Sequence, residues 1–280
     1  MAERKEFSLT GVIGWPVFQS RSPLLHAYWL RKYGINGAYV PMAVQPGRLE
    51  TALRGLSALG FVGCNVTIPH KEAAFGVVDR VDPVAQRLRA INLVVVERDG
   101  SLSGFNKDGY GFIENVKEAA PDWRAAAGPA VVLGSGGGAR SVVTSLLDAG
   151  VPEVRLLNRT RARAEQLAAV LGGPIRLLDW PERAAALAGA ALLVNTTNLG
   201  MTGQPPLELD LAALPATALV ADIVYNPLET PLLAVARSRG NRVVRGLGML
   251  LHQARPAFAA WFGIDPEITA EIRREIEGTI

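Results

Sequence analysis

The second half of the chain contains a run of residues with the types and spacing of a dinucleotide-binding loop. Gly134-Ser-Gly-Gly-Gly-Ala139 follows an apolar stretch and opens a segment with apolar residues at helical spacing. In this context the G-x-G-x-x-A glycines permit a tight turn, and the helix N-terminus offers N–H groups to a pyrophosphate. A plain tight turn is the alternative. The predicted cofactor contacts of this loop are Gly134, Ser135, Gly136, Gly137, Gly138 and Ala139.

The residues after the next expected strand indicate which dinucleotide would bind. NAD sites commonly have an acidic residue there, on the ribose 2′-OH, whereas this chain has Asn158-Arg159-Thr160-Arg161-Ala-Arg163. Three arginines at the positive end of a helix dipole are unfavourable unless an anion is present, and guanidinium groups match phosphate in bidentate geometry. The pattern therefore favours NADP over NAD. A solvated helix start capped by Thr160 is the alternative.

A lysine in the first half of the chain, Lys71, is the candidate for proton transfer. It follows Pro69-His70 where a helix should begin, and the positive end of the helix dipole disfavours the ammonium form. A lysine in such a place can exchange a proton with a substrate hydroxyl near neutral pH. A solvated surface lysine is the alternative, and a neighbouring carboxylate would oppose the effect of the dipole.

Two serines, Ser20 and Ser22, have the chemistry of a carboxylate pocket. They lie just before Pro23, at the expected start of a helix, where hydroxyl donors and the helix dipole both favour an anion. Ser22-Pro23 is also typical of an N-cap and the first helical residue, so a simple cap is the alternative for Ser22. The three histidines lack the spacing of metal ligands, and we predict no metal site.

The elements that must position these residues follow an α/β pattern. Short apolar runs alternate with helical patterns almost from end to end, which predicts mostly parallel sheets. A Pro/Ala/Gly-rich stretch at 119–129 separates two α/β units. The end of the chain is predicted to be helical, with one helix from about Leu250 to Phe262 and another opened by Asp265-Pro266.

Composition narrows the function classes. The 280 residues, 49% of them hydrophobic and 20% charged, suit one large or two ordinary globular domains. Lys and Arg exceed Asp and Glu by 29 − 26 = 3, a balance that suits a small anionic ligand at least as well as nucleic acid. A single cysteine, Cys64, excludes an intrachain disulfide. Without a secretory h-region, or the roughly 18 apolar residues of a membrane span, we expect a cytoplasmic protein that binds neither nucleic acid nor a membrane.

Several of these motifs, taken in order, resemble the shikimate dehydrogenase family over essentially the whole chain. The matching segments are residues 14–26, 65–71, 104–111, 158–160, 195–201, 222–231 and 246–253. The resemblance implies a substrate-binding α/β domain over residues 1–110, with 247–280 packing back on it. It also implies a Rossmann-type doubly wound NADP domain over 111–246. The implied reaction is the reversible NADP-linked interconversion of 3-dehydroshikimate and shikimate.

The resemblance also assigns roles to individual residues. It gives Lys71 the catalytic proton transfer and places Asp108 beside it, in contact with the substrate hydroxyls; a turn or N-cap aspartate is the alternative for Asp108. The remaining implied substrate contacts are Ser20, Ser22, Thr67, Asn92, Tyr225 and Gln253. The remaining implied cofactor contacts are Asn158, Arg159, Thr160, Arg163, Thr196, Ile223, Gly246 and Met249. Met249 could equally be a core methionine.

Four positions depart from the family pattern. Lys107 stands where the family usually has threonine, and it could pair with Asp108 or point to solvent. Arg89 and Leu93 replace glycine and threonine around Asn92, and Gln19 replaces a usual histidine. These departures leave two alternatives: a paralogue acting on quinate or another cyclic polyol acid, or a catalytically silent NADPH-binding protein. The oligomeric state is also open, with a homodimer as one alternative.

Overall fold

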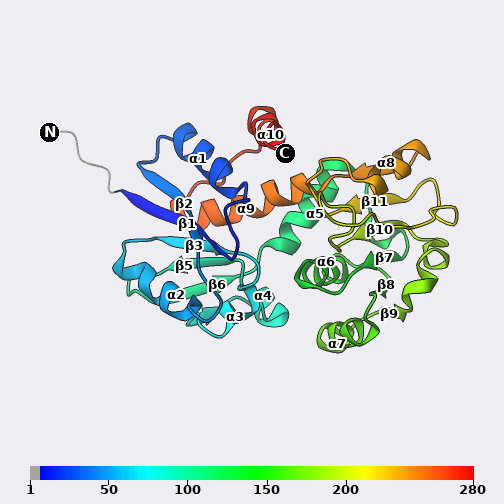
Figure 1. The fold of residues 1–280 in the computed structure, drawn as a ribbon, viewed down its shortest axis with the longest axis horizontal. Helices are drawn as coiled ribbons and strands as arrows, with labels where there is room; N and C mark the ends of the chain where they lie inside the picture. Colours follow the sequence, from blue (N-terminus) through cyan, green and yellow to red (C-terminus); the bar gives the residue numbers. More distant parts are fainter. Residues whose placement is uncertain (1–6) are drawn as a thin grey trace. The chain divides into compact units, whose positions relative to one another are not determined.

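The computed structural model describes residues 7–280, which divide into two compact units (Figure 1). Unit 1 is discontinuous and comprises the residues up to Lys107 together with Gln253–Thr279, whereas unit 2 comprises Asp108–His252. These boundaries lie a few residues away from the expected ones at 110 and 247. Among the described residues, no helix has the length and apolar character needed to cross a membrane.

Unit 1 is built on a six-stranded mixed sheet. Its elements are β1 (Ser8–Gly14), α1 (Ser22–Lys32), β2 (Gly37–Ala43), α2 (Leu49–Ala58), β3 (Gly63–Val66), α3 (Lys71–Phe75), β4 (Arg80–Val81), α4 (Pro83–Leu88), β5 (Leu93–Val96), β6 (Leu102–Phe105), the second half of α9 (Gly246–Phe262) and α10 (Ala270–Glu277). The strand order is β2-β1-β3-β5-β6-β4. The hairpin β5–β6 is antiparallel, and β1, β2 and β3 are parallel.

Helices cover both faces of this sheet (Figure 1). On one face, α2, α3 and α4 bury Leu53, Ala74 and Ala85, respectively, against Ile13 and Val66 of the strands. On the other face, α1 and the second half of α9 form an aromatic cluster with β2, and α10 packs on α1. The return of the C-terminal helices to the first domain, predicted from the sequence, is confirmed.

Unit 2 is a fully parallel six-stranded sheet. Its elements are α5 (Asp108–Ala119), β7 (Ala130–Leu133), α6 (Gly137–Asp148), β8 (Val154–Leu157), α7 (Arg161–Leu171), β9 (Ile175–Leu178), β10 (Leu192–Asn195), β11 (Leu219–Asp222), α8 (Pro231–Ser238), β12 (Arg242–Val244), the first half of α9 and the short 3-10 helices Ala125–Ala127, Trp180–Arg183 and Ala185–Leu187. The order β12-β11-β10-β7-β8-β9 is that of the doubly wound Rossmann sheet. The predicted fold class is confirmed.

The strands of unit 2 read as continuous apolar runs because both faces of the sheet are buried. Ala130 and Val132 of β7 belong to the core shared with α5, α6 and α7, and Val131 and Leu133 belong to the core on the opposite face with α8. In this topology ligands bind beyond the carboxyl ends of the strands, where the strand order reverses. That point lies between β7 and β10.

Two predicted helix starts are wrong. Helix α9 begins at Gly246, four residues before the predicted start at Leu250. Helix α10 begins at Ala270 rather than at Asp265-Pro266, because the Thr269 hydroxyl caps it by accepting from the Ile272 amide. The Asp265 carboxylate is instead bound by the Arg255 guanidinium, at 2.5 and 3.1 Å.

Candidate active site

In unit 1, Lys71 is the first residue of α3, as predicted. His70 occupies the N-cap position and its side chain makes no capping hydrogen bond. The backbone carbonyl of Lys71 accepts from the Ile91 amide at 2.8 Å. This bond attaches the start of α3 to the loop that carries Asn92, so two predicted substrate-site residues lie on neighbouring, hydrogen-bonded segments. Thr67 closes the same region from the end of β3, where its carbonyl accepts from the His70 amide at 2.9 Å.

A buried chain of neutral hydrogen-bonding groups connects three of the predicted substrate residues. The Ser22 side chain hydrogen-bonds to the phenol of Tyr39, and that phenol donates to Asn65 Oδ1 at 2.8 Å. Asn65 Nδ2 donates to the Asn92 carbonyl at 3.0 Å. Asn92 Nδ2 in turn donates to Gln253 Oε1 at 3.4 Å. The structure thus brings Ser22, Asn92 and Gln253 together, through two residues that the sequence reasoning missed.

The expected N-cap role of Ser22 is wrong. Ser22 is the first residue of α1, and Arg21 occupies the N-cap position without a side-chain capping bond. The Ser22 hydroxyl is directed to Tyr39, while Ser20 Oγ accepts from the Ser22 amide at 3.3 Å. The Arg21 guanidinium donates to the carbonyl of Thr279. The hydroxyls of Ser20 and Ser22 both lie at this helix start.

Burial favours the neutral forms of three ionisable groups of unit 1, His26, Tyr39 and Cys64. His26 stacks parallel on Tyr39 with ring centroids 4.1 Å apart, and neither of its ring nitrogens has a hydrogen-bond partner among residues 7–280. Burial lowers the pKa of His26 to about 3. Burial also raises the pKa of Tyr39 and of the Cys64 thiol well above their ordinary values.

No metal site emerges around the histidines. His70 Nε2 lies 2.7 Å from the carbonyl of Val44, and in unit 2 His252 Nε2 lies 3.0 Å from Glu118 Oε2. Within residues 7–280, no group of three or more His, Cys, Asp or Glu side chains is arranged to hold a metal ion.

The Lys107 side chain follows neither alternative considered from the sequence, since it neither pairs with Asp108 nor points to solvent. Its Nζ lies 3.3 Å from Asp82 Oδ2, in an ion pair whose side chains are 28% and 13% exposed. Its backbone N–H donates to Asn92 Oδ1 at 2.8 Å. Lys107 therefore touches the predicted substrate residue Asn92 through its backbone, while its charge is directed to the start of α4.

In unit 2, the glycine loop lies between the carboxyl end of β7 and the start of α6, as predicted. Gly134 has φ +110, and a Cβ there would lie 2.6 Å from Thr196 Oγ1. A Cβ on Gly138 would lie 2.6 Å from Ile223 Cδ1. Around Gly136 and Gly137 a Cβ would meet no heavy atom of the described residues within 4 Å. The loop thus packs against two predicted cofactor residues and leaves its own tip open, which is the cradle that a pyrophosphate requires.

The three arginines after β8 have different surroundings. Arg161 is bound to Glu165 at 2.9 Å and to Asp179 at 2.5 Å, and these carboxylates raise the pKa of its guanidinium. The exposed side chains of Arg159 and Arg163 have no hydrogen-bond or ion-pair partner among residues 7–280. Two cations therefore remain for an anion such as a 2′-phosphate.

The turn that contains these arginines is not closed by Thr160, so the expected threonine cap is wrong. Thr160 occupies the N-cap position of α7, but its side chain makes no capping bond. Asn158 Nδ2 donates instead to the Thr160 carbonyl at 2.8 Å. The first amides of α7 remain without a side-chain cap, next to the two unpaired arginines.

A buried carboxylate, Asp222, joins the loops after β10 and β11 and was missed from the sequence as a site residue. It is 2% exposed and accepts from Thr230 Oγ1 at 2.7 Å, from the Val224 amide at 3.0 Å and from Asn195 Nδ2 at 3.0 Å. Burial raises its pKa to about 6, although these three hydrogen bonds act in the opposite direction. Asn195 and Asp222 are register partners at the carboxyl ends of adjacent parallel strands, which is the signal that could have found them.

Most of the remaining predicted residues follow these strands. Thr196 donates to the Leu133 carbonyl at 2.6 Å, and Ile223 and Tyr225 lie in the loop after Asp222. Gly246 starts α9 so close to this loop that a Cβ would lie 2.6 Å from the Ile223 carbonyl oxygen.

The two other predicted site residues of unit 2 lie on its helices. Asp108 is the buried first residue of α5. Met249 is half-buried and packs on the core of unit 2, in keeping with the core alternative.

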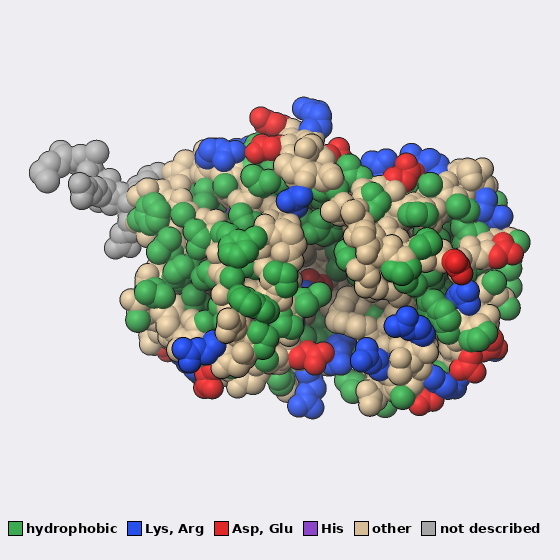
Figure 2. Space-filling model, viewed as in Figure 1, with side chains coloured by type: hydrophobic (Ala, Val, Ile, Leu, Met, Phe, Trp, Pro, Cys, Tyr) green, Lys and Arg blue, Asp and Glu red, His purple; other side chains and the backbone are tan. Residues whose placement is uncertain are grey.

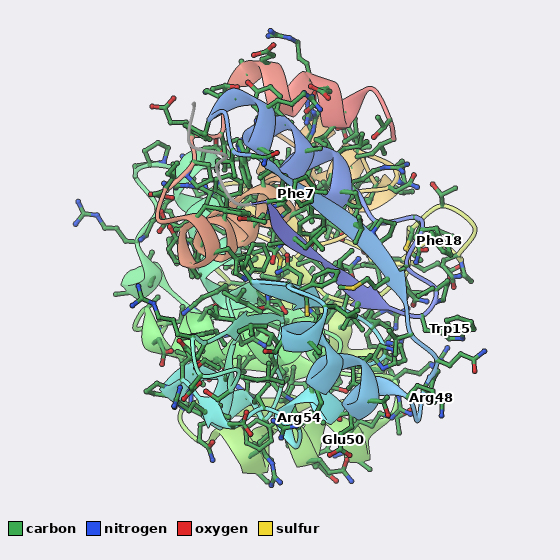
Figure 3. All side chains as sticks on the ribbon, turned by 90° about the vertical axis from the view of Figure 1, so that its left-hand side faces the viewer. Phe7, Trp15, Phe18, Arg48, Glu50 and Arg54 are labelled. Atoms are coloured by element: carbon green, nitrogen blue, oxygen red, sulfur yellow. The ribbon has the colours of Figure 1, made fainter. Side chains whose placement is uncertain are left out.

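Apolar side chains are exposed next to the serines of unit 1. Trp15 and Phe18, 41% and 74% exposed, belong to the loop between β1 and Ser20 (Figure 3). Trp15 and Arg48 line a surface hollow together with Val44 and Thr51. On the face shown in Figure 2, Lys and Arg side chains are spread among Asp and Glu instead of forming one basic patch.

Family models match this chain in three segments. Residues 12–94 match the shikimate dehydrogenase substrate binding domain, residues 116–200 match shikimate / quinate 5-dehydrogenase, and residues 246–277 match the shikimate 5'-dehydrogenase C-terminal domain. The first segment lies in unit 1 and the second in unit 2.

Individual proteins are similar over nearly the full length. The shikimate dehydrogenase (NADP(+)) of Paramagnetospirillum magneticum is 59% identical over 265 residues, which cover 95% of this chain and 96% of that protein. The crystal structure of shikimate 5-dehydrogenase from Thermus thermophilus, in complex with NADP(H) and shikimate, is 36% identical with a TM-score of 0.85, covering 97% and 99% of the two chains. Quinate dehydrogenase from Corynebacterium glutamicum, in complex with NAD, is 30% identical with a TM-score of 0.89, covering 98% and 99%.

Proposed function

Because this chain belongs to the shikimate dehydrogenase family, we propose that it catalyses the reversible NADPH-dependent reduction of 3-dehydroshikimate to shikimate in aromatic amino-acid biosynthesis. The observation that carries the proposal is the neutral hydrogen-bonded chain from Ser22 to Gln253, next to the start of α3 at Lys71. Neutral donors and acceptors suit the hydroxyls of a polyol acid. Two serine hydroxyls at the start of α1 suit its carboxylate.

In this proposal each site residue has one role, either in proton transfer or in binding the substrate. Bound NADPH supplies the hydride to the ring carbon of the substrate. Nζ of Lys71 gives a proton to the oxygen of that carbon during reduction and takes it back during oxidation. Asp108 accepts a hydrogen bond from a substrate hydroxyl, and Asn92, Thr67, Tyr225 and Gln253 hold the others.

The glycine loop and the arginines of unit 2 support NADP as the cofactor. The open tip at residues 136–137 fits a pyrophosphate, and the unpaired Arg159 and Arg163 fit a 2′-phosphate. The amide of Asn158, where NAD sites commonly have a carboxylate, supports the same choice. We also propose that the protein acts in the cytoplasm on small molecules alone.

The likeness to a quinate dehydrogenase that binds NAD makes quinate the second candidate substrate. It differs from shikimate by a saturated ring with one more hydroxyl, so the same neutral contacts could accept it.

Turnover by the purified protein tests the proposal. NADPH formation is measured with NADP and shikimate, with NAD and quinate alongside. We expect turnover that prefers NADP and shikimate. In Lys71→Ala, kcat should fall by about 10³-fold because the proton donor is lost, while the KM for NADP should stay near the wild-type value. Binding of NADPH without turnover on either substrate would contradict the proposal and favour the silent NADPH-binding alternative.

A further inference from the structure

Two residues that depart from the family pattern, Arg89 and Lys107, are connected through the short helix α4. Asp82 caps the start of α4, since its Oδ1 accepts from the Ala85 amide at 2.8 Å. Arg89 occupies the C-cap position at the other end. Both capping residues also contact segments outside α4, and both contacts lead to the predicted substrate residues of unit 1.

At the first end, the ion pair between Asp82 and Lys107 holds the end of β6 against α4. Lys107 Nζ lies 3.3 Å from Asp82 Oδ2, and the Asp82 amide donates to the Gly104 carbonyl at 3.0 Å. Through these two contacts the start of α4 holds strand β6 at Gly104 and the side chain of residue 107. Its backbone N–H, 2.8 Å from Asn92 Oδ1, has a defined position as a result.

At the second end, Arg89 has φ 49 and is the one non-glycine residue with a positive φ among residues 7–280. This left-handed conformation is unfavourable for a residue with a Cβ. The Arg89 guanidinium lies over the ring of Phe75, 5.8 Å from its centroid, at a distance that permits a cation–π interaction. Phe75 ends α3, the helix that Lys71 begins.

These contacts determine how the Asn92 amide is presented. Its oxygen is occupied by the Lys107 N–H, and its carbonyl by the Val66 amide and Asn65 Nδ2. Its side-chain NH₂ group is therefore directed toward Gln253. A ligand oxygen at this point must accept a hydrogen bond, and an Asn92 amide turned the other way would present the wrong group.

We infer that Arg89 and the Asp82–Lys107 ion pair are positioning residues which, from the two ends of α4, hold the Asn92 amide and the start of α3 in the geometry that binds the polyol substrate. The inference rests on the proposed function for the identity of the substrate. It extends that function to residues that touch no ligand themselves.

The ion pair is tested with Lys107→Met, Asp82→Asn and the double variant. Asparagine caps helices as well as aspartate, so Asp82→Asn weakens the ion pair and keeps the cap. We expect each single variant to raise the KM for shikimate about three- to fivefold and the double variant to add little, because one interaction is removed in all three. The KM for NADP should not change. Arg80→Met, which removes a second 3.3 Å ion pair of unit 1, with Asp99, should leave both constants unchanged.

Arg89→Gly separates positioning from stability. Glycine adopts the left-handed conformation without strain, so Tm should be at least that of the wild type. The loss of the contact with Phe75 should nevertheless raise the KM for shikimate about two- to threefold. A residue with a purely structural role would change Tm and leave KM unaffected.

The exchange rate of the Lys107 backbone amide gives a readout that needs no ligand. In ligand-free protein this N–H should exchange several-fold faster in Lys107→Met and Asp82→Asn than in the wild type. Unchanged exchange in both variants would overturn the inference whatever the kinetics show. Faster exchange with an unchanged KM in an active enzyme would also overturn it. A wild-type protein without turnover would refute the proposed function alone, and amide exchange would still decide the positioning of residue 107.

Discussion

The two units organise their buried polar groups in opposite ways. In unit 1 the chain from Ser22 through Tyr39 and Asn65 to Gln253 consists of neutral hydroxyls and amides. In unit 2 the corresponding network converges on a carboxylate, Asp222, which accepts from neutral donors.

The difference predicts which buried groups change protonation near neutral pH. Three buried groups of unit 1, His26, Tyr39 and Cys64, change protonation well outside the range from pH 5 to 8, since the pKa of His26 is about 3 and those of Tyr39 and Cys64 are raised far above neutral. Burial raises the pKa of Asp222 to about 6, inside that range. Protonation of these three groups is therefore insensitive to pH near neutrality, and protonation of Asp222 is not.

Removal of the Asp222 carboxylate has the largest expected effect on stability. Asp222→Ala leaves the Thr230 hydroxyl and the Val224 amide without their acceptor, and buried unsatisfied donors cost about 1–3 kcal/mol each. We expect the free energy of unfolding of unit 2 to fall by about 3 kcal/mol, measured by native-state hydrogen exchange of the β10 and β11 amides. Asp210→Ala, which removes an exposed carboxylate that accepts from the Ala212 amide, serves as the control. Equal losses in the two variants would contradict the role of Asp222 as the centre of the network.

This network also marks the limit of what the sequence could predict. Apolar runs that alternate with helical patterns predicted the parallel sheet of unit 2. Periodicity and glycine spacing depend on local structure alone. Asn195, one partner of Asp222, lies 27 residues away, so their meeting depends on the pairing of β10 with β11, which a single sequence does not specify.

The same reason explains the errors at single residues in unit 1. Ser22 has the local pattern of an N-cap, but Tyr39 from β2 competes for its hydroxyl. Lys107 follows Asn106 and precedes Asp108, yet it pairs with Asp82, 25 residues away. Residue types predicted the kind of chemistry correctly, whereas individual partners depended on tertiary packing. The roles of the individual site residues in binding and catalysis stay predictions.

The second largest effect concerns charge at the proposed cofactor site. Arg159→Ala and Arg163→Ala should each raise the KM for NADP by at least about tenfold, near 1.4 kcal/mol or more, because a charge-assisted bond to the 2′-phosphate is lost. The KM for NAD should stay constant, since NAD has no such phosphate. Arg161→Ala is the matched control, because that guanidinium is already bound to Glu165 and Asp179. A larger effect at Arg161 than at its neighbours would contradict the assignment.

An effect of similar size is expected in the neutral network of unit 1. Tyr39→Phe removes the hydroxyl that donates to Asn65 Oδ1 at 2.8 Å. The free energy of unfolding of unit 1 should fall by about 1.5 kcal/mol because a buried acceptor loses its donor. The loss should be the same at pH 5 and pH 8, as measured by hydrogen exchange of the β3 and β5 amides. A loss that depends on pH over this range would remove the distinction between the two units.

The smallest effect is the pH dependence that Asp222 gives to unit 2, and its sign follows from its raised pKa. The folded carboxyl has a pKa of about 6, against an ordinary value of 3.8 in the unfolded chain, so between these values the folded state binds the proton more tightly. The contribution of Asp222 to stability is therefore fully present at low pH and declines as pH rises through 6. From pH 7 to pH 5, the free energy of unfolding of the wild type should increase by about 1 kcal/mol relative to Asp222→Asn, which has no proton to bind. Urea unfolding of both proteins across this range measures the difference, with Asp210→Asn as the variant that should follow the wild type. A difference that is constant with pH would show that Asp222 does not titrate in this range, and the contrast between the two units would then be one of connectivity alone.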